Sequence, residues 1–247
     1  MREFSNNTNA RLPVLFLLDA SSSMNGIVRG DNQHIVRQEY ADGINWNIVT
    51  GDNMVTRMDE LNTGLHRFVS DILADPLAKL AADVAVITFA RKVTTVKEFG
   101  PIRESDTGLK ISTSQENETL LGEAVELALA ELDSRKRTYR EHGVEYYQPW
   151  LVVMTDGVPT STRHRELEER LKELTANRKL SVFVFGIGRA DLSELCSISP
   201  GRPPMQINDQ KFPELFAWLS RSVRMVSMSV PDDEVSLTPL PDDVWQV

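Results

Sequence analysis

Cysteine is nearly absent from this chain, since Cys196 is the single one in 247 residues. One cysteine permits no internal disulfide and no zinc site built from cysteines, which fits a reducing compartment. With no base beside it in the sequence, we expect Cys196 to be an inert, buried or half-buried thiol. Long apolar runs are also missing, because no stretch approaches the roughly 20 residues that span a bilayer. The polar residues 1–7 do not resemble a signal peptide, so we expect a cytoplasmic protein without membrane contact.

Basic residues are outnumbered, with 27 Lys and Arg against 36 Asp and Glu, which gives a formal net charge of −9. This balance argues against a nucleic-acid partner, because proteins that bind phosphate backbones usually display a basic stripe. Basic or metal-mediated partners are favoured instead. The 41% hydrophobic content is enough for one substantial core. We expect one domain over residues 1–229, followed by an acidic, proline-containing tail over residues 230–247.

Strand-like and helix-like patterns alternate along the chain. Continuous apolar runs predict core strands at residues 12–18, 84–89, 150–155 and 181–187, with shorter strands at 93–99 and 205–207. Helical spacing of apolar residues predicts helices at 58–73, about 120–132, 163–178, 193–197 and 211–225. Such alternation is typical of a doubly wound α/β fold with a mostly parallel sheet. The short link at Ala90-Arg91 predicts that residues 84–89 and 93–99 form an antiparallel pair.

Residues 26–53 form an insertion between the first strand and the first helix. Asp42-Gly43 stands between two alternating segments, so residues 34–41 and 44–50 are predicted to form a two-stranded ribbon. Tyr40 and Trp46 are aromatic residues in a mainly polar segment, and they are candidates for contact with a partner. The alternative is a surface excursion with no binding role, because loops tolerate insertions at small cost.

The tail from residue 230 carries several acidic residues among three prolines, which disfavour both helix and sheet. One interpretation is a disordered acidic end. The other is an extended strap that lays its apolar residues across the domain or a partner. Those residues are Leu237, Leu240, Val244 and Trp245.

Oxygen-bearing side chains follow the predicted strands at three places. Asp19, Ser21 and Ser23 come directly after the first strand, Thr119 precedes a helix, and Asp156 follows a third core strand. Ligands of parallel sheets gather beyond the carboxyl ends of the strands, and oxygens of this kind suit Mg²⁺, with Mn²⁺ and Ca²⁺ as alternatives. Such an ion keeps an open position for an anionic oxygen from outside. Each residue also has a plainer interpretation, Asp19 and Asp156 as turn residues and Thr119 as a helix N-cap.

The combination Asp19-Ala20-Ser21-Ser22-Ser23, Thr119 before Leu120-Leu121-Gly122, and Thr155-Asp156-Gly157 resembles the metal-ion-dependent adhesion site (MIDAS) of von Willebrand factor A domains. The resemblance implies a Rossmann-like, mostly parallel sheet with one antiparallel edge strand. It also implies a metal ion that mediates protein contacts, so an enzyme is not expected. Two features depart from the family pattern. The insertion is unusually long, and Glu118 replaces the usual glycine or threonine, which makes it a further candidate for partner contact.

Within that family the chain is most similar to the bacterial TerY-like branch. The similar segments are Arg11-Leu12-Pro13-Val14, Leu120-Leu121-Gly122-Glu123-Ala124, Thr155-Asp156-Gly157-Val158-Pro159-Thr160 and the proline-rich end with Trp245. That branch is associated with tellurite resistance, stress and phage defence. The resemblance therefore implies protein partners, among them a kinase or a phosphatase encoded nearby.

Two other classes of function stay open at this point. A strand-end aspartate with Mg²⁺ also suits a phosphohydrolase, but Ser21 stands where phosphohydrolases of the haloacid-dehalogenase type carry their acid. A scaffold that recruits partners without metal is the other alternative. Gly186-Ile187-Gly188 is only a weak match to a nucleotide-binding loop, because its third glycine is missing.

Overall fold

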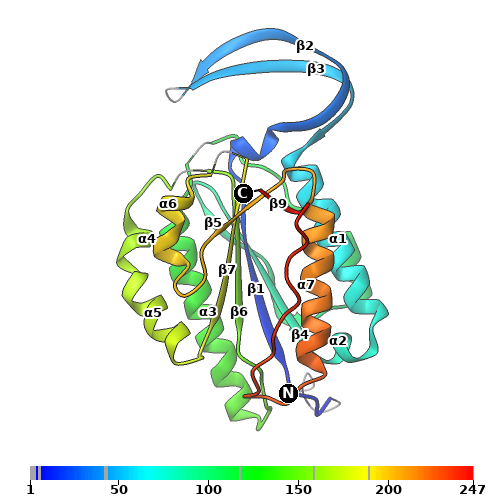
Figure 1. The fold of residues 1–247 in the computed structure, drawn as a ribbon, viewed down its shortest axis with the longest axis vertical. Coiled ribbons are helices and arrows are strands. Elements are labelled where there is room, and N and C mark those ends of the chain that lie inside the picture. Colours follow the sequence, from blue (N-terminus) through cyan, green and yellow to red (C-terminus); the bar gives the residue numbers. More distant parts are fainter. Residues whose placement is uncertain are drawn as a thin grey trace.

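The structure is a computed structural model that describes residues 4, 7–41, 44–116, 118–157, 159–188 and 190–246. Within these residues a seven-stranded sheet in the order β5-β4-β1-β6-β7-β8-β9 lies between two layers of helices (Figure 1). Its strands are β1 (Leu12–Asp19), β4 (Ala82–Phe89), β5 (Val93–Pro101), β6 (Trp150–Thr155), β7 (Ser181–Ile187), β8 (Met205–Ile207) and β9 (Trp245–Gln246). The helices are α1 (Arg57–Ala74), α2 (Pro76–Ala81), α3 (Leu121–Glu141), α4 (Arg163–Glu166), α5 (Glu168–Ala176), α6 (Leu192–Leu195) and α7 (Phe212–Ser227).

The central strands are parallel and buried on both faces, as their continuous apolar runs predict. β1 pairs with β4 on one side and with β6 on the other, and β6 pairs in turn with β7. The predicted antiparallel pair is confirmed, because β5 runs antiparallel to β4. A second antiparallel strand, β9, comes from the tail and pairs with β8. The α/β fold with a mostly parallel sheet therefore agrees with the sequence analysis.

Two clusters of buried side chains among the described residues fill the two sides of the sheet. Phe16 and Leu18 of β1 belong to the cluster beneath α1 and α7, whereas Leu15 and Leu17 belong to the cluster beneath α3 and α5. The alternation of side chains along a strand produces this division. α1 and α7 approach closely at Gly64, where any Cβ would collide with the ring of Phe216.

Three local predictions differ from the structure. The helix expected at 163–178 is split at Leu167, whose N–H donates to the carbonyl of His164 in a tight turn. The short helix expected at 193–197 begins one residue earlier and ends as a 3₁₀ turn at Cys196–Ile198. Cys196 is exposed rather than buried, because Leu195 and Ile198 take the positions that face the core.

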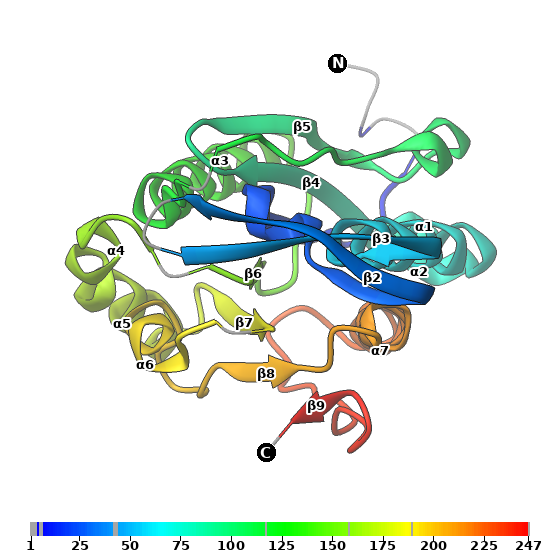
Figure 2. The same ribbon diagram turned by 90° about the horizontal axis from the view of Figure 1, so that it is seen from above.

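The inserted ribbon is confirmed and is longer than predicted. It consists of β2 (Ile27–Ala41) and β3 (Ile44–Thr56), which pair with several register shifts. The predicted turn at Asp42-Gly43 lies outside the described residues. The ribbon arches over the carboxyl edge of the sheet, from the α1 side toward α3 and α4 (Figures 1 and 2). β3 leads directly into α1, where Thr56 and Asp59 form a capping box.

The tail is an extended strap, so the alternative of a disordered end is wrong. Its chain runs along α7 (red in Figure 1) and ends as β9 at the edge of the sheet. Val244 is completely buried, and Leu237 and Leu240 pack against the core. The Trp218 Nε1–H donates to the carbonyl of Thr238 at 2.7 Å. The side chain of Trp245 lies outside the described residues. No helix in the described parts of the chain is long and apolar enough to cross a bilayer.

A buried ionic cluster that the sequence analysis did not anticipate joins α3 to the start of β4. The Arg135 Nε–H donates to Oδ2 of Asp83 at 2.7 Å, and the Tyr139 hydroxyl donates to the same oxygen. Asp83 is 1% exposed and Arg135 is 9% exposed. Burial, followed by the charge of Asp83, raises the pKa of the Tyr139 hydroxyl, which therefore stays a proton donor.

We expect Asp83→Ala to lower the free energy of unfolding by about 3–5 kcal/mol, because it leaves a buried guanidinium without its carboxylate. Urea unfolding followed by circular dichroism measures this change. Glu126→Ala is the control, since it breaks an ion pair with Arg163 in which both side chains are about half exposed. The control should cost less than about 1 kcal/mol. Equal effects of the two substitutions would contradict a structural role for the buried cluster.

Candidate metal centre

The first part of the site is the turn that follows β1. The Ser21 N–H donates to Oδ1 of Asp19 at 2.8 Å, which bends the chain directly after the strand. A short 3₁₀ helix, Ser22–Asn25, follows and brings the hydroxyls of Ser21 and Ser23 within 2.8 Å of each other. Asp19 therefore does act as a turn residue through one oxygen. This role is compatible with a second one, because its other oxygen points to a neighbouring strand.

The second part comes from β6, the parallel neighbour of β1. Their register places Leu18 beside Met154, so the residues that follow each strand emerge side by side. The Ser23 hydroxyl donates to Oδ1 of Asp156 at 2.6 Å. The Thr155 hydroxyl donates to Oδ2 of Asp19 at 2.5 Å. The hydroxyls of Ser21 and Ser23 link the two carboxylates, because the Ser21 side chain also hydrogen-bonds to Asp19. Thr155 is a contact of Asp19 that the sequence analysis did not single out.

Thr119 completes the cluster from a third segment. It is buried, and it is not a capping residue, because Leu120 is the N-cap of α3 and makes no side-chain capping bond. Its backbone is held by Thr160, whose N–H donates to the carbonyl of Thr119 at 3.2 Å. A Cβ at Gly157 would lie 3.0 Å from Oγ1 of Thr119 and 3.5 Å from Oδ2 of Asp19. Glycine there leaves open the space that both oxygens border.

The two carboxylates are buried close to each other, which is unfavourable without a cation. Burial raises the pKa of Asp19. Burial and then the charge of Asp19 raise the pKa of Asp156 to about 7, against hydrogen bonds from Ser23 and Arg57. Within the described residues no three His, Cys, Asp or Glu side chains gather as a metal cluster. The donor set is thus two carboxylates with several hydroxyls, and it fits a hard divalent cation that also keeps water ligands.

Arg57 is the residue of this region that the sequence analysis missed. Its Nη1 donates to Oδ2 of Asp156 at 3.1 Å and to the carbonyl of Ser23 at 3.3 Å, while Nε donates to Asp209 at 2.8 Å. The guanidinium lies between two glycines, because a Cβ at Gly26 or Gly188 would come within 2.6 Å of its nitrogen atoms. The Gly186-Ile187-Gly188 motif therefore accommodates an arginine in this structure. No pattern in the sequence links residue 57 to residue 156.

The structure does not bring the predicted partner-contacting residues into this cluster. Glu118 is exposed, and its carboxylate lies 3.7 Å from Nε of Arg91. Tyr40 is 73% exposed on the ribbon. Trp46 pairs with Glu39 through the backbone, and its side chain lies outside the described residues. The five predicted ligands converge, whereas Glu118 is exposed and Tyr40 and Trp46 belong to the ribbon.

The model of the von Willebrand factor type A domain matches residues 49–217. The chain belongs to this family. The match includes Thr119 and Asp156 but begins after Asp19, Ser21 and Ser23. Only the hydrogen bonds of this first loop in the structure assign it to the same site. None of the curated proteins matches the chain.

Solved structures show the same fold at low sequence identity. The conserved hypothetical protein BatB from Bacteroides thetaiotaomicron is 16% identical with a TM-score of 0.58, over 88% of this chain and 100% of that one. The pilus adhesin SpaC from Lactobacillus rhamnosus GG is 12% identical with a TM-score of 0.60, over 89% and 32%. Proximal thread matrix protein 1 from the mussel byssus, with a zinc-occupied MIDAS motif, is 19% identical with a TM-score of 0.50, over 90% and 46%. This chain therefore spans about half the length of the mussel protein.

We expect Arg57→Gln to bind Mg²⁺ about tenfold more tightly than the unaltered chain, measured by isothermal titration calorimetry near pH 8. The guanidinium is a fixed positive charge against Asp156, and removing it lowers the repulsion of a divalent ion by an energy on the order of 1 kcal/mol. Arg67→Gln on the same helix is the control, because that side chain is exposed and, among the described residues, pairs with Asp71 and not with Asp156. Weaker Mg²⁺ binding by Arg57→Gln would contradict the repulsion.

The raised pKa of Asp156 predicts a pH dependence of stability in the metal-free chain. The folded state holds a proton up to about pH 7, whereas an unfolded aspartate releases it near 3.8. Stability from this group therefore falls as the pH rises between these values, by at most roughly 1.4 kcal/mol per unit, and the loss is complete above pH 7. Urea unfolding in EDTA measures it.

Mg²⁺ should restore the lost stability above pH 7, because it replaces the proton as the positive charge beside Asp156. Asp156→Asn should remove both the slope with pH and the effect of Mg²⁺. An unchanged slope in this variant would assign the pH dependence to another group.

Proposed function

We propose that this chain is a metal-dependent protein-interaction module that captures an acidic side chain or a phosphate of a partner through a bound Mg²⁺. The observation that carries the proposal is the convergence of Asp19 and Asp156, linked by the hydroxyls of Ser21 and Ser23, at one edge of the sheet. Membership of the von Willebrand factor type A family supports it. The zinc-occupied MIDAS motif of the mussel protein, which shares the fold, supports a divalent cation as the ligand of this chain.

Each predicted ligand has a role in this proposal. Ser21, Ser23 and Thr119 would bind the ion through their hydroxyls, while Asp19 and Asp156 would hold its water ligands. Because hydroxyls are neutral, the ion keeps most of its charge and attracts an anionic oxygen from outside. Hard oxygen donors favour Mg²⁺, with Mn²⁺ and Ca²⁺ as alternatives.

The inserted ribbon belongs to the proposed docking face. β2 begins at Ile27, two residues after the 3₁₀ helix that carries Ser23, and β3 ends beside Arg57. A partner that contacts the ion therefore meets the ribbon as well (Figure 1). The ribbon presents exposed apolar side chains, with Ile35 at 54% and Tyr40 at 73% exposure. We propose Tyr40, Trp46 and Glu118 as contacts with the partner.

The proposed role is binding rather than catalysis. The phosphohydrolase alternative needs Asp19 as a nucleophile, yet Asp19 is completely buried and both its oxygens accept hydrogen bonds. The TerY-like branch, its stress or phage-defence context, the kinase or phosphatase partner and the cytoplasmic location stay predictions.

Calorimetry and co-purification test the proposal together. The unaltered chain should bind Mg²⁺ and retain a partner from its native host. Thr119→Ala removes a hydroxyl ligand and Asp19→Asn removes the charge of a carboxylate, so each variant should lose at least about tenfold in Mg²⁺ affinity. EDTA should release the partner and added Mg²⁺ should restore it.

Glu126→Ala, an exposed change outside the cluster, is the matched control and should bind as the unaltered chain does. Circular dichroism checks that each variant folds. Partner retention that survives EDTA and the Asp19→Asn change would support the metal-free scaffold instead.

A further inference from the structure

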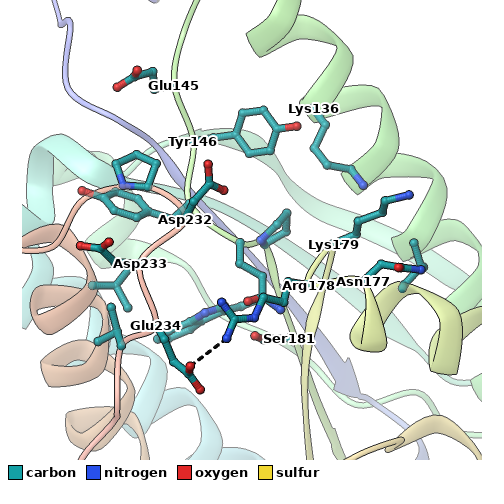
Figure 3. A pocket seen from close by; sticks show the side chains of 18 of the residues that line it. Lys136, Glu145, Tyr146, Asn177, Arg178, Lys179, Ser181, Asp232, Asp233 and Glu234 are labelled. Atoms are coloured by element: carbon teal, nitrogen blue, oxygen red, sulfur yellow. Dashed lines mark hydrogen bonds and ion pairs between the residues drawn. The ribbon is translucent and has the colours of Figure 1, made fainter.

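A large cavity lies at the opposite end of the sheet from the metal centre. It has a volume of about 1170 Å³ and opens at the amino ends of β6 and β7 (Figure 3). Its walls include the last turns of α3, the connection from α3 to β6, the connection from α5 to β7, and the strap at residues 230–237. The metal centre lies at the carboxyl ends of the same parallel strands, so the two sites do not overlap.

The domain side of this cavity is basic, and the strap side is acidic. The domain contributes five cationic side chains and two carboxylates to the lining, whereas the strap contributes three carboxylates. The cations are Lys136, Arg140, Arg178, Lys179 and Arg202, the carboxylates of the domain are Asp133 and Glu145, and those of the strap are Asp232, Asp233 and Glu234. The cavity is therefore a cationic surface that an acidic segment of the same chain partly covers.

Local structure holds these cations at the rim. α5 ends in a Schellman motif, in which the N–H groups of Arg178 and Lys179 donate to the carbonyls of Thr175 and Leu174. Arg178 takes the left-handed position with φ of 53°, where glycine is usual. In Figure 3, Lys179 and Lys136 point toward one another from the two walls. Arg202 stacks over the ring of Phe183, with 4.4 Å from its Cζ to the ring centroid.

The carboxylates of the strap form ion pairs with only some of these cations. Arg178 donates to Glu234 at 2.8 Å, but both side chains are exposed, by 60% and 79%, and an exposed pair of this kind contributes at most about 1 kcal/mol. Lys136 pairs with Asp133. Arg140, Lys179 and Arg202 form no ion pair with any carboxylate in the described parts of the chain.

The strap is anchored beyond its acidic turn. Val244 is buried, Trp218 holds the carbonyl of Thr238, and β9 pairs with β8. Residues 232–234 are exposed, and Asp232 has a left-handed backbone with φ of 75°. The turn can therefore leave the cavity while the rest of the strap stays in place.

We infer that this cavity binds an acidic peptide segment of a partner protein, and that the strap's own turn at residues 232–234 is a weak internal occupant of the same site. The strap indicates the class of ligand, because it is an extended peptide with three acidic residues followed by the apolar Val235 and Leu237. The cations that it leaves unpaired are available to a longer or more acidic segment.

A labelled peptide of residues 229–238 tests this inference by fluorescence anisotropy with the full chain. A strap-neutral chain, with Asp232→Asn, Asp233→Asn and Glu234→Gln, should bind the peptide severalfold more tightly than the unaltered chain, because its intramolecular competitor is weakened. In that background, Arg140→Glu with Lys179→Glu should lower the affinity at least about tenfold. Both side chains are exposed, so the fold should tolerate these changes. Lys92→Glu, an exposed charge reversal in the turn between β4 and β5, is the matched control and should have no effect.

Three results would overturn the inference. They are equal binding by the strap-neutral and unaltered chains, binding that survives the double reversal, and equal binding of a scrambled peptide or a single-stranded oligonucleotide. The expected binding does not change with EDTA or with Asp19→Asn, so it stands or fails separately from the metal-dependent function. Should the double reversal fail to fold, Lys179→Gln alone should still weaken binding severalfold.

Discussion

Two carboxylates buried beside each other are the constraint on which this molecule depends. Asp19 ends β1 and Asp156 follows the neighbouring parallel strand β6, so the register of the two strands brings both to the same place. Their mutual repulsion must be relieved by a proton, a metal ion or a nearby cation. The surrounding side chains stabilise the two carboxylates in part, through hydrogen bonds from the hydroxyls of Ser23 and Thr155 and through the positive charge of Arg57. A site that is close to balanced in this way would bind a divalent ion, as proposed, without holding it so tightly that the ion loses its attraction for outside oxygens.

The sequence predicts the part of this arrangement that arises from local patterns. Continuous apolar runs identify the core strands, and strand ends in a parallel sheet meet at one edge, so Asp19 and Asp156 could be brought together without a structure. Arg57 could not, because its partner is 99 residues away and nothing in its local pattern differs from an ordinary helix start. Asp83 and Arg135, separated by 52 residues, are hidden for the same reason. The tail was ambiguous because prolines exclude helix and sheet but do not decide between an extended strap on the surface and disorder.

The two ends of the sheet carry opposite electrostatic problems. The carboxyl edge has an excess of buried negative charge, whereas the amino ends of β6 and β7 border a cavity whose domain side has an excess of positive charge and whose strap side is acidic. Segments outside the common α/β core lie at each end, the ribbon at the first and the beginning of the strap at the second, from which the strap runs along α7 (Figure 1). The chain's net charge of −9 therefore hides a local basic surface. Composition alone describes the average, while partners respond to the local distribution of charge.

The long insertion does not disturb the metal centre because its two ends are fastened together. The N–H of Arg57 donates to the carbonyl of Gly26 at 2.9 Å, and the Arg57 guanidinium lies against the same glycine. The ribbon thus leaves and rejoins the domain at one point, and the turn that carries Ser21 and Ser23 keeps its geometry whatever the distal strands do. Because the two ends of the ribbon are held together, a longer ribbon adds little to the conformational-entropy cost of folding. The same hydrogen bond places Arg57 between the ribbon and Asp156. A displacement of the ribbon and a change of charge at Asp156 would therefore both affect the Arg57 side chain.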